Sequence, residues 1–351
     1  MAGKTQRSAD RELVLVDGCR TPFCKAGTEL RATSAADLAT HVFREVLDRT
    51  GIDPATIDEV ILGCAGPASD EANVARVAAL RAGIPQRVPA VTVMRNCASG
   101  MEALFTAQAR LRAGEGEVFL VGGAESMSGF PLLMNDEMVR FFTRLGKARS
   151  AVAKVKTLAS FRPRFLKPRI AVVEGLTDSV TGLSMGQTAE NLAREFEISR
   201  QEQDRFAMES HRRAEAALEQ GRFGREIAPL TPAPRHDSWV EQDNGVRRGQ
   251  SLEALAKLKP VFDRHEGDVT VGNACQITDG AVAMLLMSRE RADQLHLEPL
   301  ARVIAQSRAG LDPRVMGLGP VHAAKPALDA AGLELADIDL FEINEAFAAQ
   351  V

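Results

Sequence analysis

Short apolar segments alternate along this chain with segments of helical periodicity, and this alternation restricts the fold more than any other feature of the sequence. The strand-like segments are residues 13–16, 59–62, 90–94, 118–121, 281–287 and 338–343. Between the early ones, residues 35–50 and 100–113 repeat apolar side chains at the spacing of one helix face. Strands that alternate with helices are typical of layered α/β folds with a largely parallel sheet, which is the fold class we predict.

A weak internal repeat suggests that an α/β unit occurs twice. Residues 51–58 and 332–339 carry Gly, Ala, Ile and Asp at the same offsets, and in each copy a helical segment precedes and a strand-like run follows. The alternative is a chance similarity between two helix-to-strand turns. If the repeat is a duplicated unit, only eight residues follow Ile343 in the second copy. We therefore expect an incomplete second unit, as in a C-terminally truncated chain.

The region between the two copies differs in character and is expected to be an inserted domain. We predict an N-terminal α/β unit at residues 1–125, an insert at 126–268 and the start of a C-terminal α/β unit at 269–351. Within the insert, residues 188–196 and 200–220 have helical periodicity.

A strongly basic stretch lies in this insert. No acidic residue occurs from Met138 to Val173, whereas ten Lys and Arg residues do, with apolar side chains among them at broadly helical spacing. A basic amphipathic helix can lie on an anionic membrane surface or bind an acidic partner, so the 139–169 segment is a candidate for peripheral membrane contact. The alternative is a solvated helix that covers a core.

Composition disfavours several other classes of protein. The net charge of −4 gives no general attraction to nucleic acid. No apolar run approaches the roughly 20 residues of a membrane span, and the polar segment 1–12 lacks the apolar core of a signal peptide or anchor. Five scattered cysteines, an odd number, predict reduced thiols and a cytoplasmic protein.

The strongest local signal for chemistry surrounds Cys97. The apolar run 91–94 ends in Arg95 and Asn96, and small residues after Cys97 open the predicted helix. A thiol at a helix N-terminus lies near unpaired backbone N–H groups, whose partial positive charge favours the nucleophilic thiolate. Small neighbours leave room for a substrate. The alternative is an inert buried cysteine.

The other thiols and the histidines give weaker signals. Three cysteines are interpreted as small core residues, namely Cys19, Cys24 and Cys64. Cys275, where a strand enters a loop, is a candidate to line a pocket. No two histidines are spaced as metal ligands, so no metal is expected. His211 and His296 are interpreted as helix-surface residues.

One apparent motif is a weak candidate. Residues 182–186 fit the Gly-x-Ser-x-Gly turn of serine hydrolases, but that turn follows a buried strand, and residues 174–181 are too polar to form one. The sequence also lacks a phosphate-binding P-loop and a Gly-x-Gly-x-x-Gly motif after a strand. These classes are therefore disfavoured.

The segment 95–100, Arg-Asn-Cys-Ala-Ser-Gly, resembles the nucleophile segment of the thiolases, which are acyl-CoA:acetyl-CoA acyltransferases. Further segments resemble the family in the same order, at residues 121–128, 184–191, 272–273, 278–281 and 344–348. The resemblance implies duplicated α/β units in layered α/β/α packing, with an inserted loop domain that contributes to coenzyme A binding. The basic stretch is similar to that of β-subunits of fatty-acid-oxidation complexes, although Asn344 stands where those often carry His.

The resemblance also implies a mechanism. Cys97 would attack the keto carbon of a 3-oxoacyl-CoA, expel acetyl-CoA and pass the acyl group to a fresh CoA, and the reverse reaction would be a Claisen condensation. Asn344 would hold a water that stabilises the enolate oxygen. No cofactor is implied, since coenzyme A is a substrate. The residues implied to line the coenzyme A tunnel are Met185, Arg247, Phe262, Cys275, Ala346 and Phe347.

Two features of the family are absent from these 351 residues, namely a Gly-His-Pro histidine and a second cysteine in a Cys-x-Gly-Gly-Gly loop. General acid–base catalysis typically contributes about 10²–10⁴-fold, so turnover is expected to be impaired. The alternatives are a condensing enzyme of the ketoacyl-synthase type and a non-catalytic CoA-binding protein. The resemblance further implies fatty-acid metabolism by β-oxidation, a homodimer or tetramer, and a hydratase/dehydrogenase partner subunit.

Overall fold

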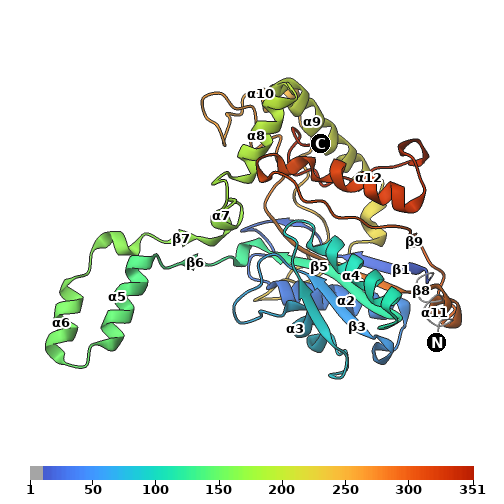
Figure 1. Cartoon of the computed structure of the whole chain (residues 1–351), viewed down its shortest axis with the longest axis horizontal. Helices are drawn as coiled ribbons and strands as arrows, with labels where there is room; N and C mark the ends of the chain where they lie inside the picture. The colour runs from blue at the N-terminus through green and yellow to red at the C-terminus, as the bar shows by residue number, and fades with distance from the viewer. Residues whose placement is uncertain (1–10) are drawn as a thin grey trace. The chain divides into compact units, whose positions relative to one another are not determined.

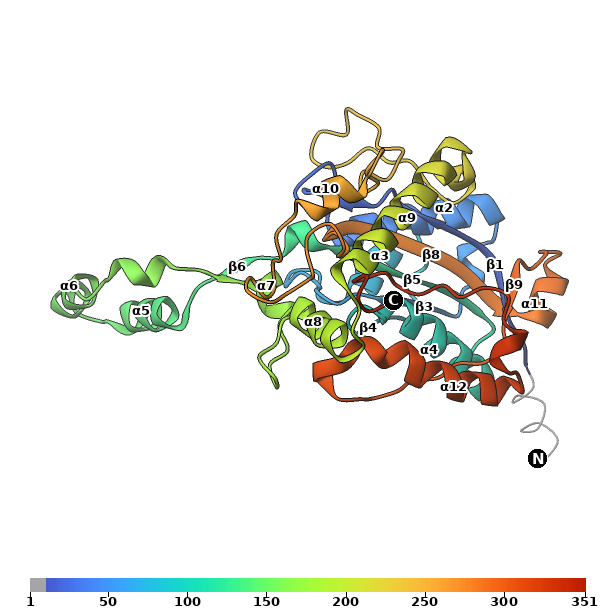
Figure 2. The same cartoon turned by 90° about the horizontal axis from the view of Figure 1, so that it is seen from above.

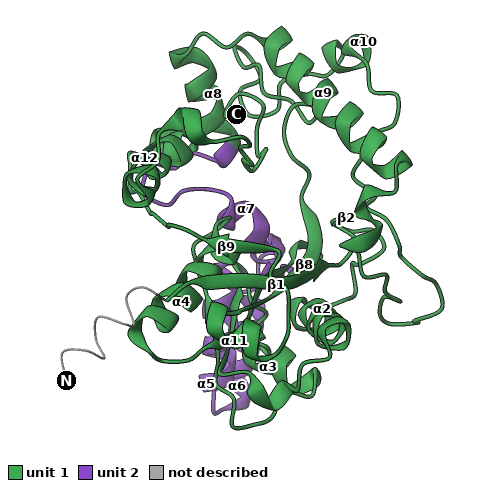
Figure 3. Ribbon diagram, turned by 90° about the vertical axis from the view of Figure 1, so that its right-hand side faces the viewer, with its two compact units in different colours: residues 1–129, 186–351 green, residues 130–185 purple. Residues whose placement is uncertain are grey.

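The computed structural model describes residues 11–351 and divides them into two compact units. Unit 1 comprises the described residues up to Gly129 together with Gly186–Val351, and unit 2 comprises Phe130–Met185 (Figure 3). The predicted insert therefore contributes to both units, because its first part forms unit 2 and its remainder packs within unit 1. Among the described residues, no helix is long and apolar enough to cross a membrane.

A seven-stranded sheet forms the centre of unit 1 (Figure 1). Its strand order is β4-β3-β5-β8-β1-β9, and the short β2 pairs with β8. The strands are β1 (Leu13–Arg20), β2 (Cys24–Lys25), β3 (Glu59–Gly63), β4 (Ala90–Val93), β5 (Val118–Ser126), β8 (Thr278–Ser288) and β9 (Ala301–Val303). Five of the six predicted strand segments are confirmed by this sheet.

The pairing of the strands corrects one prediction, because the sheet is mixed and not largely parallel. β3 pairs in parallel with β4 and β5, whereas β8 pairs antiparallel with both β5 and β1. The long strand β8 comes from far along the chain and inserts between β5 and β1. The alternation of strands and helices in the first 125 residues does not indicate that a strand from so far along the chain will pair with them.

Helices cover both faces of this sheet. α2 (Ala35–Thr50) and α3 (Val74–Arg81) pack on the face to which Val60 of β3 points. α4 (Ser99–Ala113) packs on the opposite face, to which the next residue, Ile61, points. Figure 2 shows α2 and α4 on opposite sides of the sheet. Because successive side chains of a strand point to opposite faces, one apolar strand supplies both cores of the α/β/α layers.

The two copies of the sequence repeat begin with the same local structure. α2 ends at Gly51 and α12 (Gly319–Ala331) ends at Gly332, and both glycines have positive φ angles, 62° and 66°. A 3₁₀ helix follows each glycine. These are η1 (Pro54–Thr56) and η6 (Leu335–Asp337). The copies then diverge, because β3 follows η1 whereas residues 338–343 form no strand. That predicted strand is wrong, because no neighbouring strand in the described chain pairs with it.

The 3₁₀ helix η2 (Met127–Gly129) ends the first part of unit 1, and its remaining helices lie in the second part. They are α8 (Met185–Glu195), α9 (Arg200–Glu219), η4 (Arg222–Arg225), α10 (Leu252–Ala256), α11 (Arg289–Gln294) and η5 (Pro313–Leu318), and α8 begins with the last residue of unit 2. α9 starts at a capping box in which Ser199 and Glu202 bond each other's backbone N–H groups. The structure thus confirms both helices predicted for this part of the insert.

Unit 2 is a helical hairpin with short strands at its base. Its elements are β6 (Leu132–Leu133), α5 (Asp136–Lys147), α6 (Ala151–Ala159), η3 (Pro163–Leu166), β7 (Arg169–Ile170) and α7 (Ala171–Gly175). β6 and β7 pair antiparallel. Phe141, Phe161 and Phe165 form a small aromatic core, with ring centroids 5.5 to 6.1 Å apart. This unit therefore has its own core, although a small one.

Candidate active site

Cys97 lies in a tight turn between β4 and α4. Asn96 has a φ angle of 45°, which is uncommon for a residue other than glycine. Two hydrogen bonds close the turn: Arg95 N–H donates to Ser99 Oγ at 2.8 Å, and Ser99 Oγ donates to the Asn96 carbonyl at 2.6 Å. Cys97 itself is exposed to solvent. The turn therefore holds the thiol outside the core, just before α4.

Glycines in the neighbouring strands let the first turn of α4 approach the sheet. A Cβ atom at Gly63 would lie 2.3 Å from the carbonyl group of Ser99, so no other residue fits there without movement of the helix. At Gly123 a Cβ atom would lie 3.4 Å from the Cα atom of Gly100. These small residues fix the position of the helix start, and hence of the Cys97 turn, relative to β3 and β5.

No side chain caps the N-terminus of α4, where Ala98 is the first flanking residue. The charged group in its first turn is Glu102, which accepts hydrogen bonds from Arg308 at 2.9 Å and from Arg95 at 2.6 Å. These bonds, chiefly that from Arg308, lower the pKa of Glu102 to about 2. The helix start near Cys97 thus carries a carboxylate that two arginines neutralise.

The C-terminal part of the chain returns to the neighbourhood of Cys97. Cys275 N–H donates to the Ala346 carbonyl at 2.8 Å, and Ala348 N–H donates to the Asn273 carbonyl at 2.9 Å. Cys275 is exposed as a residue, but its sulfur has lost much of its hydration. This desolvation, followed by the nearby Cys97 thiol, raises the pKa of Cys275. Cys97, Cys275 and the segment 344–348 therefore lie together.

An apolar cluster adjoins Cys275. The rings of Phe262 and Phe347 meet edge to face, with centroids 5.9 Å apart and an interplanar angle of 84°. Ala274 packs in the same cluster. Gly186, near the start of α8, leaves room for the Phe262 ring, because a Cβ atom there would lie 2.2 Å from it. Two of the residues predicted to line the tunnel thus contact each other.

Polar groups lie beside the segment 344–348. Arg247 N–H donates to Nδ1 of His211 at 3.2 Å. Burial, and then the charge of Arg247, lowers the pKa of His211, whereas the nearby Glu345 acts in the opposite direction. Ser210 donates a hydrogen bond to Glu345. His211 lies on α9, as predicted, but it is half-buried beside two candidate site segments and not on the open surface. His296 is exposed, as predicted, but it lies in the turn after α11 and not on a helix.

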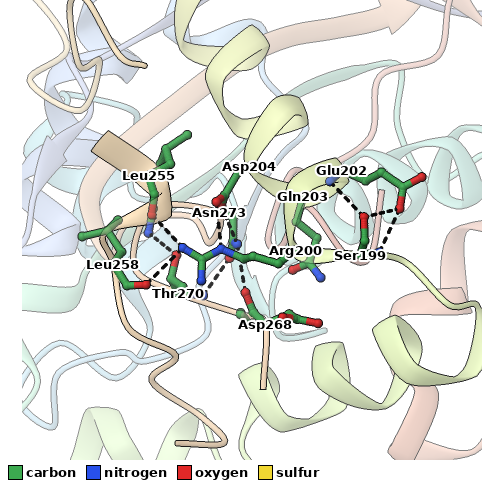
Figure 4. A network of polar contacts seen from close by, with 12 residues as sticks. Ser199, Arg200, Glu202, Gln203, Asp204, Leu255, Leu258, Asp268, Thr270 and Asn273 are labelled. Carbon is green, nitrogen blue, oxygen red and sulfur yellow. Dashed lines mark hydrogen bonds and ion pairs between the residues drawn. The ribbon is translucent and has the colours of Figure 1, made fainter. Parts of the chain in front are cut away.

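A buried polar network holds residues 269–274, which lead to Cys275 and form turns and not the predicted strand (Figure 4). Nδ2 of Asn273 donates to Asp204 at 3.0 Å and to the Asp268 carbonyl at 3.1 Å, and its Oδ1 accepts from Thr270 N–H at 2.7 Å. Arg200 donates to Asp204 at 2.8 Å. Satisfied buried networks of this kind fix a single conformation. Asn273 lies in a segment that resembles the family, but no role was predicted for it.

Glu190 of α8 supports the same segment from the other side, and it was also missed. Its carboxylate accepts the N–H groups of Asp268 and Val269, each at 3.0 Å. Although it is a charged residue, its side chain is buried. A buried carboxylate needs such donors. The spacing of the sequence did not reveal this contact, because 78 residues separate Glu190 from Asp268.

The predicted site residues thus fall into two groups. The structure gathers Cys97, Phe262, Cys275, Ala346 and Phe347, and it links Arg247 to them through His211. Asn344 is exposed and begins a tight turn, in which its carbonyl accepts from Ala346 N–H at 2.9 Å. Met185 ends unit 2 and is not part of the cluster in unit 1. Within the described residues, no side chain forms a hydrogen bond with the Cys97 sulfur.

The three cysteines interpreted as core residues are buried, which confirms that interpretation. These are Cys19, Cys24 and Cys64. Burial raises the pKa of each of these thiols to about 12. They therefore remain thiols and are poor nucleophiles.

Comparison with known proteins gives the family of the chain. The thiolase N-terminal domain matches residues 13–290, and the thiolase C-terminal domain matches residues 297–351. An acetyl-CoA acetyltransferase of Pseudomonas aeruginosa is 41% identical, over 97% of this chain and 82% of its own length. A probable acetyl-CoA acyltransferase of Staphylococcus aureus is 40% identical, over 96% of this chain and 81% of its own.

Solved structures agree with these sequence matches. The crystal structure of a Bacillus anthracis acetyl-CoA acetyltransferase has a TM-score of 0.87 and 38% identity, and the match covers 98% of this chain and 82% of that one. Human mitochondrial 3-ketoacyl-CoA thiolase in complex with CoA has a TM-score of 0.84 and 36% identity, over 97% and 80%. The fold of this chain is a mixed α/β fold, and its candidate site contains an exposed cysteine at the start of a helix. This chain belongs to the thiolase family, which disfavours the ketoacyl-synthase alternative.

Proposed function

We propose that this chain transfers acyl groups between 3-oxoacyl-CoA and CoA through a thioester on Cys97. The observation that supports this most directly is the exposed Cys97 thiol at the start of α4, beside Cys275 and the segment 344–348. Relatives named acetyl-CoA acetyltransferase or acyltransferase support the same reaction class. A solved neighbour bound to CoA supports coenzyme A as the acyl carrier.

The proposed reaction has two steps. The Cys97 thiolate attacks the 3-oxo carbon, the bond between the second and third carbons breaks, and acetyl-CoA leaves with the proton that the thiol gave up. The acyl group remains on Cys97 as a thioester. The thiol of a second CoA then attacks this thioester, and its proton returns to Cys97. Such a covalent intermediate divides one difficult step into two easier ones.

The surrounding residues are assigned roles in this proposal. Asn344 holds a water that donates to the enolate oxygen, which is an oxyanion-hole role. Phe262, Ala346 and Phe347 line the path of the pantetheine arm, and Cys275 contacts the substrate next to the nucleophile. Arg247 is assigned to the coenzyme A site, whereas the role of Met185 stays a prediction from the family resemblance. The β-subunit type and a hydratase/dehydrogenase partner stay predictions, since no relative named above is described as a subunit of a complex.

We propose that a polypeptide of these 351 residues becomes acylated on Cys97 more readily than it completes the catalytic cycle. It contains no Gly-His-Pro histidine and no Cys-x-Gly-Gly-Gly cysteine to move protons. In the structure, no side chain of the described residues bonds to the Cys97 sulfur as a general base would. We therefore expect steady-state thiolysis to be at least about 100-fold below that of a typical thiolase.

Intact-mass spectrometry tests the nucleophile directly. The purified chain is mixed with acetyl-CoA, and the expected product carries the mass of one acetyl group. Cys97→Ala should abolish this adduct, whereas Cys275→Ala, a matched loss of the other exposed thiol, should retain it. An adduct that persists in Cys97→Ala and disappears in Cys275→Ala would show that Cys275, and not Cys97, is the nucleophile.

A second measurement separates the enzyme from a non-catalytic CoA-binding protein. Thiolysis of a 3-oxoacyl-CoA is followed as the loss of its enolate absorbance, together with the affinity for CoA. Binding of CoA with no adduct on a folded chain would favour the binding protein. Robust steady-state thiolysis would support acyl transfer and refute the impairment.

A further inference from the structure

Unit 2 differs in charge from the rest of the chain. Between residues 130 and 185 there are ten Lys and Arg and only four Asp and Glu, a net charge of +6 in a chain whose total is −4. Only Arg164 and Arg169 of these ten form ion pairs in the part of the chain that the structure describes. Eight cationic side chains in one small unit are therefore available to an external partner.

Unit 2 also exposes more large apolar side chains than it buries. Its core contains only three buried residues, which are Met138, Phe141 and Phe165. Its exposed large apolar side chains number twelve and include those of Val139, Phe142, Val152, Val155 and Leu158. Contiguous exposed apolar side chains next to polar ones are typical of surfaces that bind a protein or a membrane.

α6 has the amphipathic pattern of an interfacial helix. It buries no residue, and Val152, Val155 and Leu158 are 78%, 65% and 53% exposed. At about 3.6 residues per turn these three lie on one face. Lys154 and Lys156 project on the two flanks of that face, where long side chains can reach headgroups while the stripe enters the acyl region.

α5 contributes a second apolar edge and a basic groove. α5 packs against α6 (Figure 1), and Val139 and Phe142 are exposed on it, one turn apart. A groove of about 430 Å³ lies on the same helix and is lined by Arg140, Arg144 and Arg164, and by Glu137, which forms an ion pair with Arg164. Arginine binds phosphate through its planar set of donors.

We propose that unit 2 is a membrane-docking device, which lays the apolar stripe of α6 and the exposed edge of α5 on an anionic phospholipid surface. The lysines beside the stripe and Arg140 and Arg144 of the groove pair with lipid phosphates. This inference rests on charge and exposure within unit 2 and does not depend on acyl transfer by Cys97. A second copy of unit 2 is a less favourable partner for this surface than an anionic membrane, because two units of net charge +6 repel each other.

Vesicle co-sedimentation of the full chain tests the proposal. Phosphatidylcholine vesicles are compared with vesicles that also contain phosphatidylglycerol, at low and high NaCl. Binding is expected only with the anionic lipid, and salt should weaken it, since screening shortens the range of charge attraction. Each basic residue near such a surface contributes roughly a fivefold gain in affinity. Lys154→Gln/Lys156→Gln should therefore weaken binding about 25-fold.

The controls separate the docking surface from general charge. Lys257→Gln/Lys259→Gln makes the same change at the same spacing on exposed residues of unit 1, and it should bind like the unchanged chain. Val152→Thr/Val155→Thr removes apolarity at nearly constant shape and should weaken binding about tenfold or more. All variants alter exposed side chains, so circular dichroism should show unchanged helix content.

Three outcomes would overturn the proposal. The first is that the chain does not sediment with anionic vesicles. The second is equal loss of binding in the two lysine variants, which would assign the effect to net charge alone. The third is concentration-dependent self-association that the valine variant abolishes, which would assign the stripe to a second copy.

Discussion

The two copies of the internal repeat have the same local structure, but only the first is buried. α2 buries nine residues against the sheet, whereas α12 buries none. Both helices end at a glycine with positive φ and continue into a 3₁₀ helix, and only the first then reaches a strand. The comparison shows that local sequence specifies helix, cap and turn, while strand formation also requires neighbouring strands that pair with it.

The contacts that hold each copy differ in kind as well. The first copy is held by apolar side chains of α2 and α3 packed on β3 and β5. The chain that precedes α12 makes polar contacts with α4 of the first copy. Arg308 bonds to Glu102 at 2.9 Å, and Gln108 donates to the Val303 carbonyl at 3.0 Å. Cooperative stability is therefore expected to reside in the first copy.

A matched pair of phenylalanines gives the largest expected contrast. Phe43 of α2 is fully buried, whereas Phe341, beyond η6 in the second copy, is 52% exposed. Phe43→Ala should lower the free energy of unfolding by about 3–5 kcal/mol, through lost burial and the cavity that remains. Phe341→Ala should lower it by less than about 1 kcal/mol. Urea unfolding followed by circular dichroism measures both.

The comparison fails if the two substitutions have similar effects. Equal losses would mean that the second copy is part of the same cooperative core. Phe341→Leu, which keeps most of the apolar surface, serves as a control for a specific aromatic contact at that position.

Much of the fold followed from sequence, for reasons visible in particular elements. Strand segments such as residues 60–62 are continuous apolar runs because α2 and α4 cover both of their faces. The helix over 35–50 was predicted at its observed bounds from its apolar spacing alone, and in the structure Ser34 caps its start and Gly51 ends it. The antiparallel insertion of β8 was not predictable, since that pairing joins residues more than 150 positions apart.

The candidate site likewise has one part that could be predicted from the sequence and one part that could not. The turn at Cys97 could be predicted because a strand, a turn and a helix adjoin in sequence. The approach of Cys275 to Cys97, and the half-buried position of His211, depend on chain segments that meet only in the folded unit. Spacing along the sequence carries no signal for such contacts, and only the family resemblance indicated that residues 275 and 344–348 belong with Cys97.

The helix-terminal glycines give a smaller contrast between the copies. A Cβ atom at Gly51 or Gly332 would meet nothing within 4 Å, so only the positive φ angle opposes alanine at either position. Gly51→Ala should cost about 1 kcal/mol, because the packed end of α2 cannot unwind to relieve the strain. Gly332→Ala should cost less than about 0.5 kcal/mol, because exposed α12 can fray. Equal costs in urea unfolding would show that α12 is held as firmly as α2.

The ion pair of Glu102 with Arg308 and Arg95 tests the link between the copies, with the smallest expected effect. The arginines are 38% and 50% exposed, so the network should contribute only about 1 kcal/mol. Since the pKa of Glu102 falls from 4.5 to about 2 on folding, this stabilisation is present above pH 4.5 and is lost as the pH falls towards 2.

Glu102→Gln should therefore lower the thermal midpoint at pH 7, and the difference from the unchanged chain should shrink towards pH 2. The exposed Glu298, which forms no ion pair in the described chain, is the matched control, and Glu298→Gln should have no measurable effect at either pH. A Glu102→Gln effect that stays constant with pH would mean that the carboxylate acts by shape at the start of α4. The second copy would then be joined to the nucleophile helix without help from charge.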